Sequence, residues 1–512
     1  VCFHCLPLEL FLMFCKKCRN PGLGSPRELF PKSLSMRVPP CGFPQYTTFM
    51  VKIGNFGAAI DSLYHASKPG LVIKSLAYRI TPQQQDTDMT ATTIQWIAAF
   101  LFAGALIHTF TASYFERLAH TSKHHSGLFH LLGEVEAVFG IWALFLVIAM
   151  AFSVDLNAAV EYVDTRKYVE PLFVFVIMVV AASRPVLDAS RMLVEGLARL
   201  MPVNKGVAFT WLGLFMVPLL GSLITEPAAM TLAALLLRDV LFSKAVPNFI
   251  RYWGLGVLFV NISIGGVLTS FAAPPVLMVA ATWNWDTPFM LANFGWKAAI
   301  GVFVNATVFI FFAAKHLGAE VKTPEALGED GQPLAPVPWW AMVIHLAFLG
   351  AVVFFAHHPA VFMGIFLFFL GFTAAYNTFQ SRLLLKEGLL VAFFLAGLVV
   401  LGGMQQWWLQ PAVSDLDDGV LFMAAMALTA ITDNAALTYL GSLIEGTSES
   451  FRYALVAGAV AGGGLTVIAN APNPAGLSLL KRQFPGEAVS AGGLLAGALA
   501  PTAVAAICFW YL

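Results

Sequence analysis

Ile431-Thr432-Asp433-Asn434-Ala435-Ala436-Leu437-Thr438 places a carboxylate, an amide and two hydroxyls in the middle of an apolar segment. A near copy, Ile224-Thr225-Glu226-Pro227-Ala228-Ala229-Met230-Thr231, lies 207 residues earlier. An acid inside an apolar run of membrane length costs about 2.5–3.5 kcal/mol on insertion scales, so it indicates a functional site. Two acids in matching contexts predict an internal repeat.

The repeat continues downstream of both acids. Gly265-Gly266-Val267-Leu268-Thr269 leads to Ala272-Ala273-Pro274-Pro275, and Gly463-Gly464-Leu465-Thr466 leads to Ala469-Asn470-Ala471-Pro472-Asn473-Pro474. Glycine and proline interrupt helices, and interruptions at matching places in two halves point to the binding site of a transporter. Ordinary kinked membrane helices are the alternative, which the recurrence of both order and chemistry disfavours.

The composition is that of a membrane protein. Of 512 residues, 58% are hydrophobic and 11% are charged, and the mean hydropathy is +0.76. Soluble domains carry about 25% charged residues, so we expect an all-α polytopic membrane protein embedded in a lipid bilayer. Nothing in the charge pattern indicates nucleic-acid binding.

Residues 1–88 differ from the rest of the chain. They hold 10 basic and 5 acidic residues and five of the six cysteines: Cys2, Cys5, Cys15, Cys18 and Cys41. Two Cys-x-x-Cys spacings match those of zinc ligands, and a small zinc module is therefore an alternative. The stretch has no sustained period, and its basic residues follow a short apolar run, which is the reverse of a signal peptide. We expect an irregular leader, with Met89 as the true start.

From Met89 onward, apolar runs recur at membrane length, about 20 residues each. Residues 89–316 form a first repeat, 317–336 a polar linker and 337–512 a second repeat. The expected runs are 93–113, 131–152, 169–184, 207–241, 251–283 and 293–316, then 337–356, 359–377, 387–405, 416–444, 451–482 and 489–512.

The fourth run of each repeat either crosses the membrane or forms a re-entrant hairpin with the acid at its tip. Cytoplasmic loops collect Lys and Arg. If all twelve runs cross, the two sides hold 9 and 10 basic residues; with two hairpins the split is 15 to 4. The hairpin arrangement is favoured. Each repeat then has five transmembrane helices, one re-entrant hairpin and one discontinuous helix, and the odd number of crossings makes the repeats inverted. Glu226 and Asp433 are expected to approach each other near the midplane.

This layout resembles the ion transporter superfamily, which includes arsenite permeases, sodium/proton antiporters and sodium-coupled dicarboxylate symporters. The likeness rests on the two acid motifs and the two Gly/Pro breaks, and covers about 89–512. It is strongest to a bacterial sodium/proton antiporter family, in which Asp433-Asn434 and the run from Gly462 to Pro474 look typical. The dicarboxylate symporters show Ser-Asn-Thr at both tips. The acids found here argue against an anionic substrate.

The resemblance implies a secondary active transporter, not an enzyme. It would exchange sodium or lithium for protons across the bacterial inner membrane by alternating access, with no cofactor and no metal other than the transported Na⁺. A hard monovalent cation prefers oxygen ligands, which the tips and breaks supply. The candidate ion-binding residues are Glu226, Asp433, Asn434, Thr225, Thr432, Thr269, Thr466, Asn470 and Asn473. The carboxylates could also carry protons, because burial of a carboxyl group favours its protonated form.

Several alternatives stay open. Asp433 is also a good helix cap, and capping is compatible with ion binding. Glu134 and Glu136 are either a proton relay or interfacial acids. An ion-coupled permease for a small oxyanion or carboxylate is a second function. A membrane di-iron oxidoreductase is a remote third, suggested by His120, His124 and His125, although a solvated loop cluster is favoured. The ion, the stoichiometry and the oligomeric state, a homodimer included, are undetermined.

Overall fold

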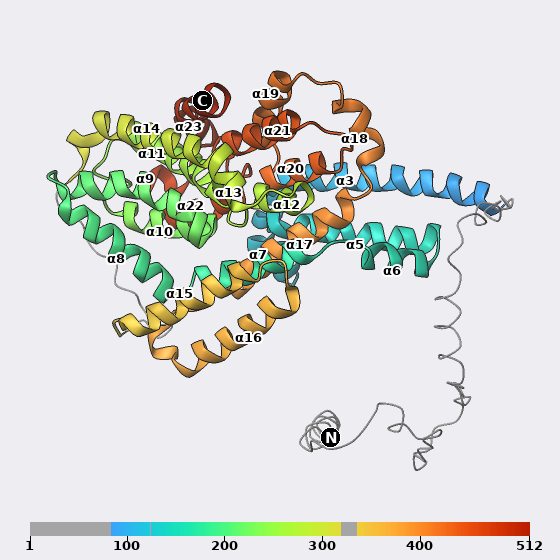
Figure 1. Cartoon of the computed structure of the whole chain (residues 1–512), viewed down its shortest axis with the longest axis horizontal. Coiled ribbons are helices and arrows are strands. Elements are labelled where there is room, and N and C mark those ends of the chain that lie inside the picture. The colour runs from blue at the N-terminus through green and yellow to red at the C-terminus, as the bar shows by residue number, and fades with distance from the viewer. Residues whose placement is uncertain (1–82, 123, 319–334) are drawn as a thin grey trace, which may run out of the picture. The chain divides into compact units, whose positions relative to one another are not determined.

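The computed structural model describes residues 83–122, 124–318 and 335–512, all within one compact unit. This part of the chain is helical and contains no β-strand, in agreement with the expected all-α class (Figure 1). The expected leader up to residue 82 and most of the expected linker lie outside the described residues.

The helices before the linker follow the predicted apolar runs, with short helices added between them. They are α3 (Gln83–Thr121), α4 (Ser126–Gly133), α5 (Val135–Ser153), α6 (Leu156–Asp164), α7 (Val169–Ala181), α8 (Arg184–Leu200), α9 (Lys205–Ile224), α10 (Glu226–Arg238), α11 (Asn248–Gly265), η2 (Gly266–Leu268), α12 (Pro274–Trp283), α13 (Thr287–Met290), η3 (Leu291–Gly295), α14 (Trp296–Ala313) and η4 (Ala314–His316).

The helices after the linker also follow the predicted apolar runs. They are α15 (Trp339–Phe354), α16 (Pro359–Ala375), η5 (Asn377–Phe379), α17 (Leu385–Gly402), α18 (Gln406–Val413), α19 (Asp418–Thr429), α20 (Asn434–Ser442), α21 (Glu449–Gly462), α22 (Pro472–Leu480), η6 (Lys481–Gln483), η7 (Pro485–Glu487) and α23 (Ala491–Tyr511).

Both acid-bearing runs are interrupted at the predicted place. In the first, Thr225 alone separates α9 from α10, and these two helices pack against each other. In the second, residues 430–433 separate α19 from α20. The Gly/Pro interruptions are also present, because residues 269–273 separate η2 from α12 and residues 463–471 separate α21 from α22.

Seven helical spans in the described part of the chain are long and apolar enough to cross a membrane, as expected for a multi-pass protein. They are Thr93–Thr121, Val135–Ser153, Lys205–Ile224, Asn248–Leu268, Thr287–His316, Leu385–Gly402 and Ala491–Tyr511. The pair α7 and α8, bent by 63°, raises the number to eight. One of the seven, Lys205–Ile224, belongs to the run expected to form the first re-entrant hairpin, so six of the seven coincide with the ten expected crossings. The other four expected crossings are not single long helices, because α7 has 13 residues, α15 and α16 have 16 and 17, and α21–α22 is broken.

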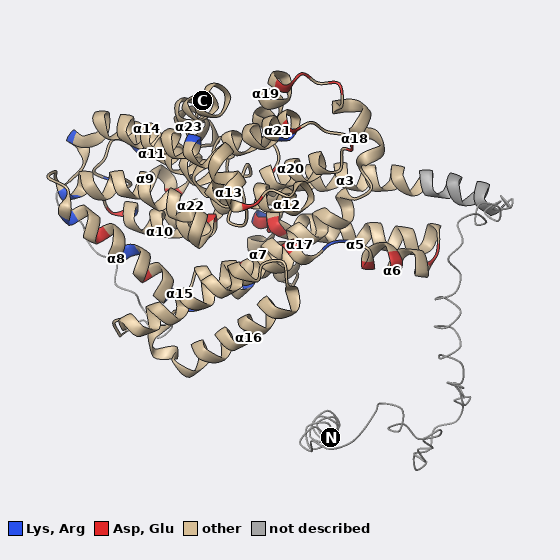
Figure 2. Ribbon diagram, viewed as in Figure 1, with Lys and Arg blue, Asp and Glu red and all other residues tan. Residues whose placement is uncertain are grey.

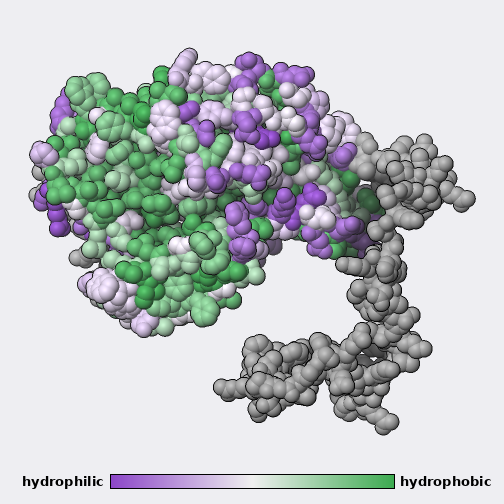
Figure 3. All heavy atoms as spheres, in the orientation of Figure 1, coloured by the Kyte–Doolittle hydropathy of each residue, from purple (hydrophilic) through white to green (hydrophobic). Residues whose placement is uncertain are grey.

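The surface has the polarity of a membrane protein. Figure 3 shows one face on which hydrophobic residues cover a broad, continuous area. Charged residues are sparse on the ribbon in Figure 2, and α8 is an exception. On α8, ion pairs join Arg184 to Asp188 and Arg191 to Glu195, while Val186 and Val194 are buried. Helix α8 is therefore amphipathic, which suits a position along a membrane surface.

The two halves pack through their interrupted helices. Helix α10 packs against α22 and helix α12 packs against α20, so each acid-bearing segment contacts the broken helix of the other half. Helices α5 and α17 also pack along each other, as do α11 and α23. Through these contacts, the helix that begins at Glu226 and the helix capped by Asp433 each pack against the helix that follows the Gly/Pro break of the other half.

Candidate functional site

Glu226 is the first residue of α10 and is fully buried. Its Oε2 accepts a hydrogen bond of 2.7 Å from Nδ2 of Asn470, a residue of the second break. Its Oε1 is buried and has no hydrogen-bond partner among the described residues. Thr225 connects α9 to α10 with φ of 70° and ψ of 151°, and its buried hydroxyl also lacks a partner there.

The first break leaves space for this carboxylate because Gly266 has no side chain. A Cβ at Gly266 would lie 2.6 Å from Cγ of Glu226 and would clash with its Oε1. The matching glycine in the other half has a similar consequence, since a Cβ at Gly463 would clash with Ser263 and lie 3.0 Å from Nδ2 of Asn434. Glycine at these two positions therefore allows the breaks to approach the polar side chains closely.

Asp433 is the N-cap of α20. Its Oδ1 accepts hydrogen bonds from the backbone N–H groups of Ala435 at 2.8 Å and Ala436 at 3.2 Å. The expected capping role is thus confirmed, and it leaves Oδ2 available. Asn434 follows with its backbone N–H donating to the carbonyl of Ala469 at 3.1 Å, in the second break. The side-chain amide of Asn434 is fully buried, and neither of its polar atoms has a partner in the described structure.

Threonine hydroxyls connect each break to the neighbouring tip. Thr269 donates to the carbonyl of Ser222 at 2.7 Å, and Thr466 donates to the carbonyl of Ala430 at 2.8 Å. Asn473 holds the second break by donating from Nδ2 to the carbonyls of Gly463 at 2.8 Å and Thr466 at 2.9 Å. These bonds use the donors of all three side chains, so their oxygens remain as acceptors.

A small cavity of about 40 Å³ lies beside Asp433, whose side chain is partly buried. We call it the Asp433 cavity. It is lined by Leu106, Thr109, Val135, Glu136, Phe139, Val391, Phe394, Ile431, Thr432, Asp433, Val467, Ile468, Asn470, Ala471 and Pro474. Most of these residues are apolar. Two carboxylates, from α5 and from the second tip, therefore share one largely apolar cavity.

Asn470 connects the two acids, because it lines the Asp433 cavity and also bonds to Glu226. Glu226 itself does not line that cavity. Glu134 lies two residues before Glu136, and its Oε1 forms an ion pair of 3.1 Å with Nζ of Lys386 on α17. That pair is exposed to solvent, with 37% of the Glu134 side chain and 63% of the Lys386 side chain accessible.

Sequence reasoning missed a set of buried polar contacts on α11. Asn261 donates to the carbonyl of Leu214 at 2.8 Å and accepts from Asn305 of α14 at 2.9 Å. Ser263 donates to the carbonyl of Val460 at 2.8 Å, which joins the two halves. The available signal was a polar residue inside a run that is otherwise apolar, where an unpaired amide is costly.

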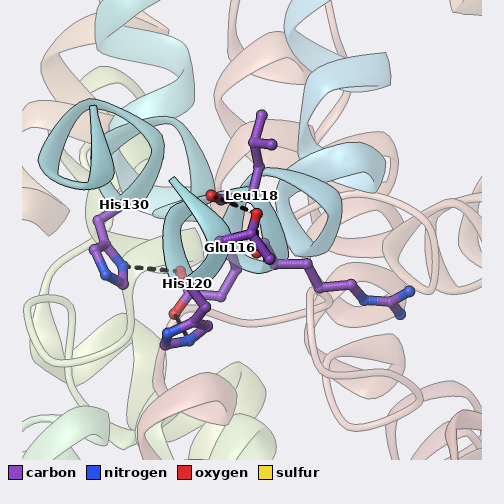
Figure 4. Close-up of polar contacts among 6 residues, drawn as sticks. Glu116, Leu118, His120 and His130 are labelled. Carbon is purple, nitrogen blue, oxygen red and sulfur yellow. Dashed lines mark hydrogen bonds and ion pairs between the residues drawn. The ribbon is translucent and has the colours of Figure 1, made fainter. Parts of the chain in front are cut away.

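Of the histidine cluster, His120 lies at the end of α3, and His124 and His125 lie exposed in the connection to α4, which carries His130. Figure 4 shows Glu116 between His120 and His130, with distances of 3.6 Å from His120 Nε2 and 3.4 Å from His130 Nδ1 to the two carboxylate oxygens. These side chains are largely exposed. Within the described ranges, no group of three or more His, Cys, Asp or Glu residues is arranged to hold a metal ion.

Comparison with known proteins gives a family. No curated protein sequence matches the chain. Among solved structures, the chain is similar to the YdaH transporter of Alcanivorax borkumensis, with 14% identity, a TM-score of 0.36, and coverage of 73% of this chain and 96% of that one. Residues 93–512 match the family described as "Putative Na+/H+ antiporter", and since this match spans most of the chain, the protein belongs to that family of transporters.

Proposed function

We propose that the protein exchanges sodium or lithium for protons across the bacterial inner membrane, with Asp433 and Glu226 as the ion-carrying groups. The observation that carries this proposal is the pair of carboxylates at matching helix breaks. Neither carboxylate forms an ion pair with Lys or Arg within the described part of the chain. A buried carboxylate without a basic partner is stabilised by a bound cation or a bound proton.

Unpaired buried oxygens support a cation site at the breaks. Such atoms are rare in folded proteins and call for a specific partner. In the described structure, the side-chain Oδ1 atoms of Asn434, Asn470 and Asn473 accept no hydrogen bond, and Glu226 Oε1 and Thr225 Oγ1 have no partner. A dehydrated Na⁺ would accept these ligands, because hard cations prefer carboxylate, amide and hydroxyl oxygens. The cation is the transported substrate, and Thr269, Thr432 and Thr466 would add further oxygens.

We further propose that the halves 89–316 and 337–512 are inverted repeats joined by the linker 317–336. In this arrangement, α9–α10 and α19–α20 are re-entrant hairpins, and α11–α12 and α21–α22 are discontinuous helices. The reciprocal packing of α10 on α22 and α12 on α20 supports this, because a two-fold relation between halves generates such exchanged contacts. The non-helical backbone at the breaks would then be surrounded by protein, and non-helical backbone at membrane depth is tolerated in such a place.

The lining of the Asp433 cavity supports a proposed route for protons. Glu136 lines the cavity together with Asp433, and Glu134 lies nearer the surface, where it pairs with Lys386. We propose that Glu136 relays protons between Glu134 and Asp433, since carboxyl groups can accept and release protons in turn. Proton and sodium would compete for Asp433, which gives exchange when access alternates between the two sides.

The decisive experiment is Asp433→Asn. Asparagine caps a helix about as well as aspartate, so the variant should fold and insert. It lacks the charge shared by Na⁺ and H⁺, so sodium-driven proton movement in everted vesicles should fall by about tenfold or more, equivalent to ~1.4 kcal/mol of binding free energy. In the wild type, lowering the pH should raise the Na⁺ concentration for half-maximal exchange, because protons then occupy the carboxylate.

Asp417→Asn is the matched control. Asp417 caps α19 through Gly419 N–H at 2.9 Å, so it tests the same cap chemistry away from the cavity. It should leave exchange unchanged. Normal exchange by Asp433→Asn, together with a half-maximal Na⁺ concentration that is independent of pH, would refute the shared carboxylate. Proton movement driven by an oxyanion or a carboxylate in the same vesicles would favour the permease.

A further inference from the structure

A second, larger cavity lies away from Asp433 and Glu226. It has a volume of about 630 Å³ and is bounded by the start of α7, the first break, α12, the α12–α13 turn and the end of α15. We call it the α7–α12 cavity. Helix α7 packs against both α12 and α15, and all three helices contribute lining residues. Figure 1 shows the three helices. A sodium ion alone needs far less space than this.

The walls combine aromatic rings with acids. Phe271 and Phe354 keep accessible ring surface at the cavity, whereas the lining residues Phe173 and Trp285 are almost fully buried. Glu170 and Asp286 are the acids among the lining residues. No Lys or Arg belongs to the lining, and its one basic residue is His357. Aromatic rings attract cations through the negative charge of their faces, and quaternary ammonium groups are recognised in this way. An apolar pocket with a few charged groups is also the usual form of a small-molecule site.

The two acids are available for a ligand. Neither forms an ion pair with Lys or Arg in the part of the chain that the structure describes. Asp286 caps α13 by accepting from Phe289 N–H at 2.8 Å, which leaves its negative charge in place. Arg166, the nearest arginine in sequence to Glu170, lies over the ring of Tyr162 at 4.5 Å and donates to that residue's carbonyl.

We propose that the α7–α12 cavity binds organic cations that carry an aromatic body, with Glu170 and Asp286 facing the charge and the aromatic residues contacting the body. This site is separate from the proposed sodium site. A cation bound here would contact α7 and α15 on one side and the first break and α12 on the other.

The test uses the purified full-length chain with its six cysteines replaced and Ala281→Cys introduced. Ala281 is exposed and lines the cavity, so a thiol reagent should reach it. Benzyltrimethylammonium should slow the labelling. Choline lacks the ring and benzyl alcohol lacks the charge, so each should need a concentration higher by about tenfold or more for equal protection. Ala488→Cys is exposed outside the cavity, and its labelling should not respond.

Glu170→Gln combined with Asp286→Asn should weaken the protection by benzyltrimethylammonium about tenfold, since both charges are lost. Asn keeps the cap of α13, and each single substitution should give part of the loss. The labelling rate without ligand reports whether the cavity is intact. Absence of protection in the parent protein, or equal protection by benzyl alcohol, would overturn the proposal. The readout involves no transport, so it is independent of whether sodium–proton exchange occurs.

Discussion

At the residue scale, Thr225 combines an unfavourable backbone with an unpaired hydroxyl. Its φ of 70° and ψ of 151° lie in a region that glycine occupies easily and a β-branched residue does not. Such strain costs about 1–3 kcal/mol. Thr225→Gly should therefore raise the thermal unfolding temperature measured without sodium, while the loss of a cation ligand should reduce the additional increase produced by Na⁺.

The control for this residue is Thr225→Ser, which keeps the hydroxyl and removes the β-branch. It should keep the Na⁺-induced increase in unfolding temperature. If Thr225→Gly binds Na⁺ as tightly as the wild type, the hydroxyl is not a ligand, and the strain at this position needs another explanation.

At the element scale, the second break contacts the first tip through one side chain. Asn470 donates from Nδ2 to Glu226, and its Oδ1 accepts no hydrogen bond. The side chain therefore holds the Glu226 carboxylate and also presents a free oxygen. Asn470→Ala should destabilise the fold by about 1–3 kcal/mol, because a buried carboxylate loses its donor. It should also reduce stabilisation by Na⁺ in a thermal unfolding assay.

Asn305→Ala is the matched control for Asn470→Ala. Asn305 is also buried and donates to Asn261, but its contacts lie in α11 and α23 rather than at the tips. Its loss should lower the unfolding temperature and preserve the Na⁺-induced increase. An equal loss of the sodium effect in both variants would show that Asn470 acts only through packing.

Most elements could be predicted from the sequence, and most contacts could not. Apolar runs of membrane length are a strong signal, and the helices of the described residues follow them. The short helices α4, α6, α13 and α18 were missed because mixed polarity over few residues gives no clear period. Helix α8 has 17 residues, and it was missed because its charged residues keep it from forming an apolar run. Glu226 and Asp433 stood out as acids in apolar runs. The bond from Asn470 to Glu226 joins residues 244 positions apart, so it depends on how the halves pack.

At the scale of the whole molecule, the first acid-bearing run either forms a re-entrant hairpin or crosses the membrane. These two arrangements place one of its neighbouring loops on different sides of the membrane. The connecting segment 185–206, most of which is the helix α8, precedes the first acid-bearing run, and the connecting segment 242–250 follows it. If α9–α10 is a re-entrant hairpin, both loops face the cytoplasm. If that run crosses the membrane, the two loops face opposite sides. Because the hairpin arrangement divides the basic residues 15 to 4 and the crossing arrangement divides them almost evenly, the positive-inside rule favours the hairpin.

Gly196→Cys and Lys244→Cys compare these two loops directly. A Cβ at Gly196 meets no atom within 4 Å, so a side chain there is tolerated, and Lys244 is exposed. In intact cells treated with a membrane-impermeant thiol reagent, neither cysteine should react until the membrane is permeabilised. Lys167→Cys, on a loop assigned to the outside, should react at once and confirms that the reagent has access.

Reaction of Lys244→Cys in intact cells while Gly196→Cys stays protected would mean that the first acid-bearing run crosses the membrane. The inverted repeat would then have to be abandoned, since the number of crossings in the first half would be even.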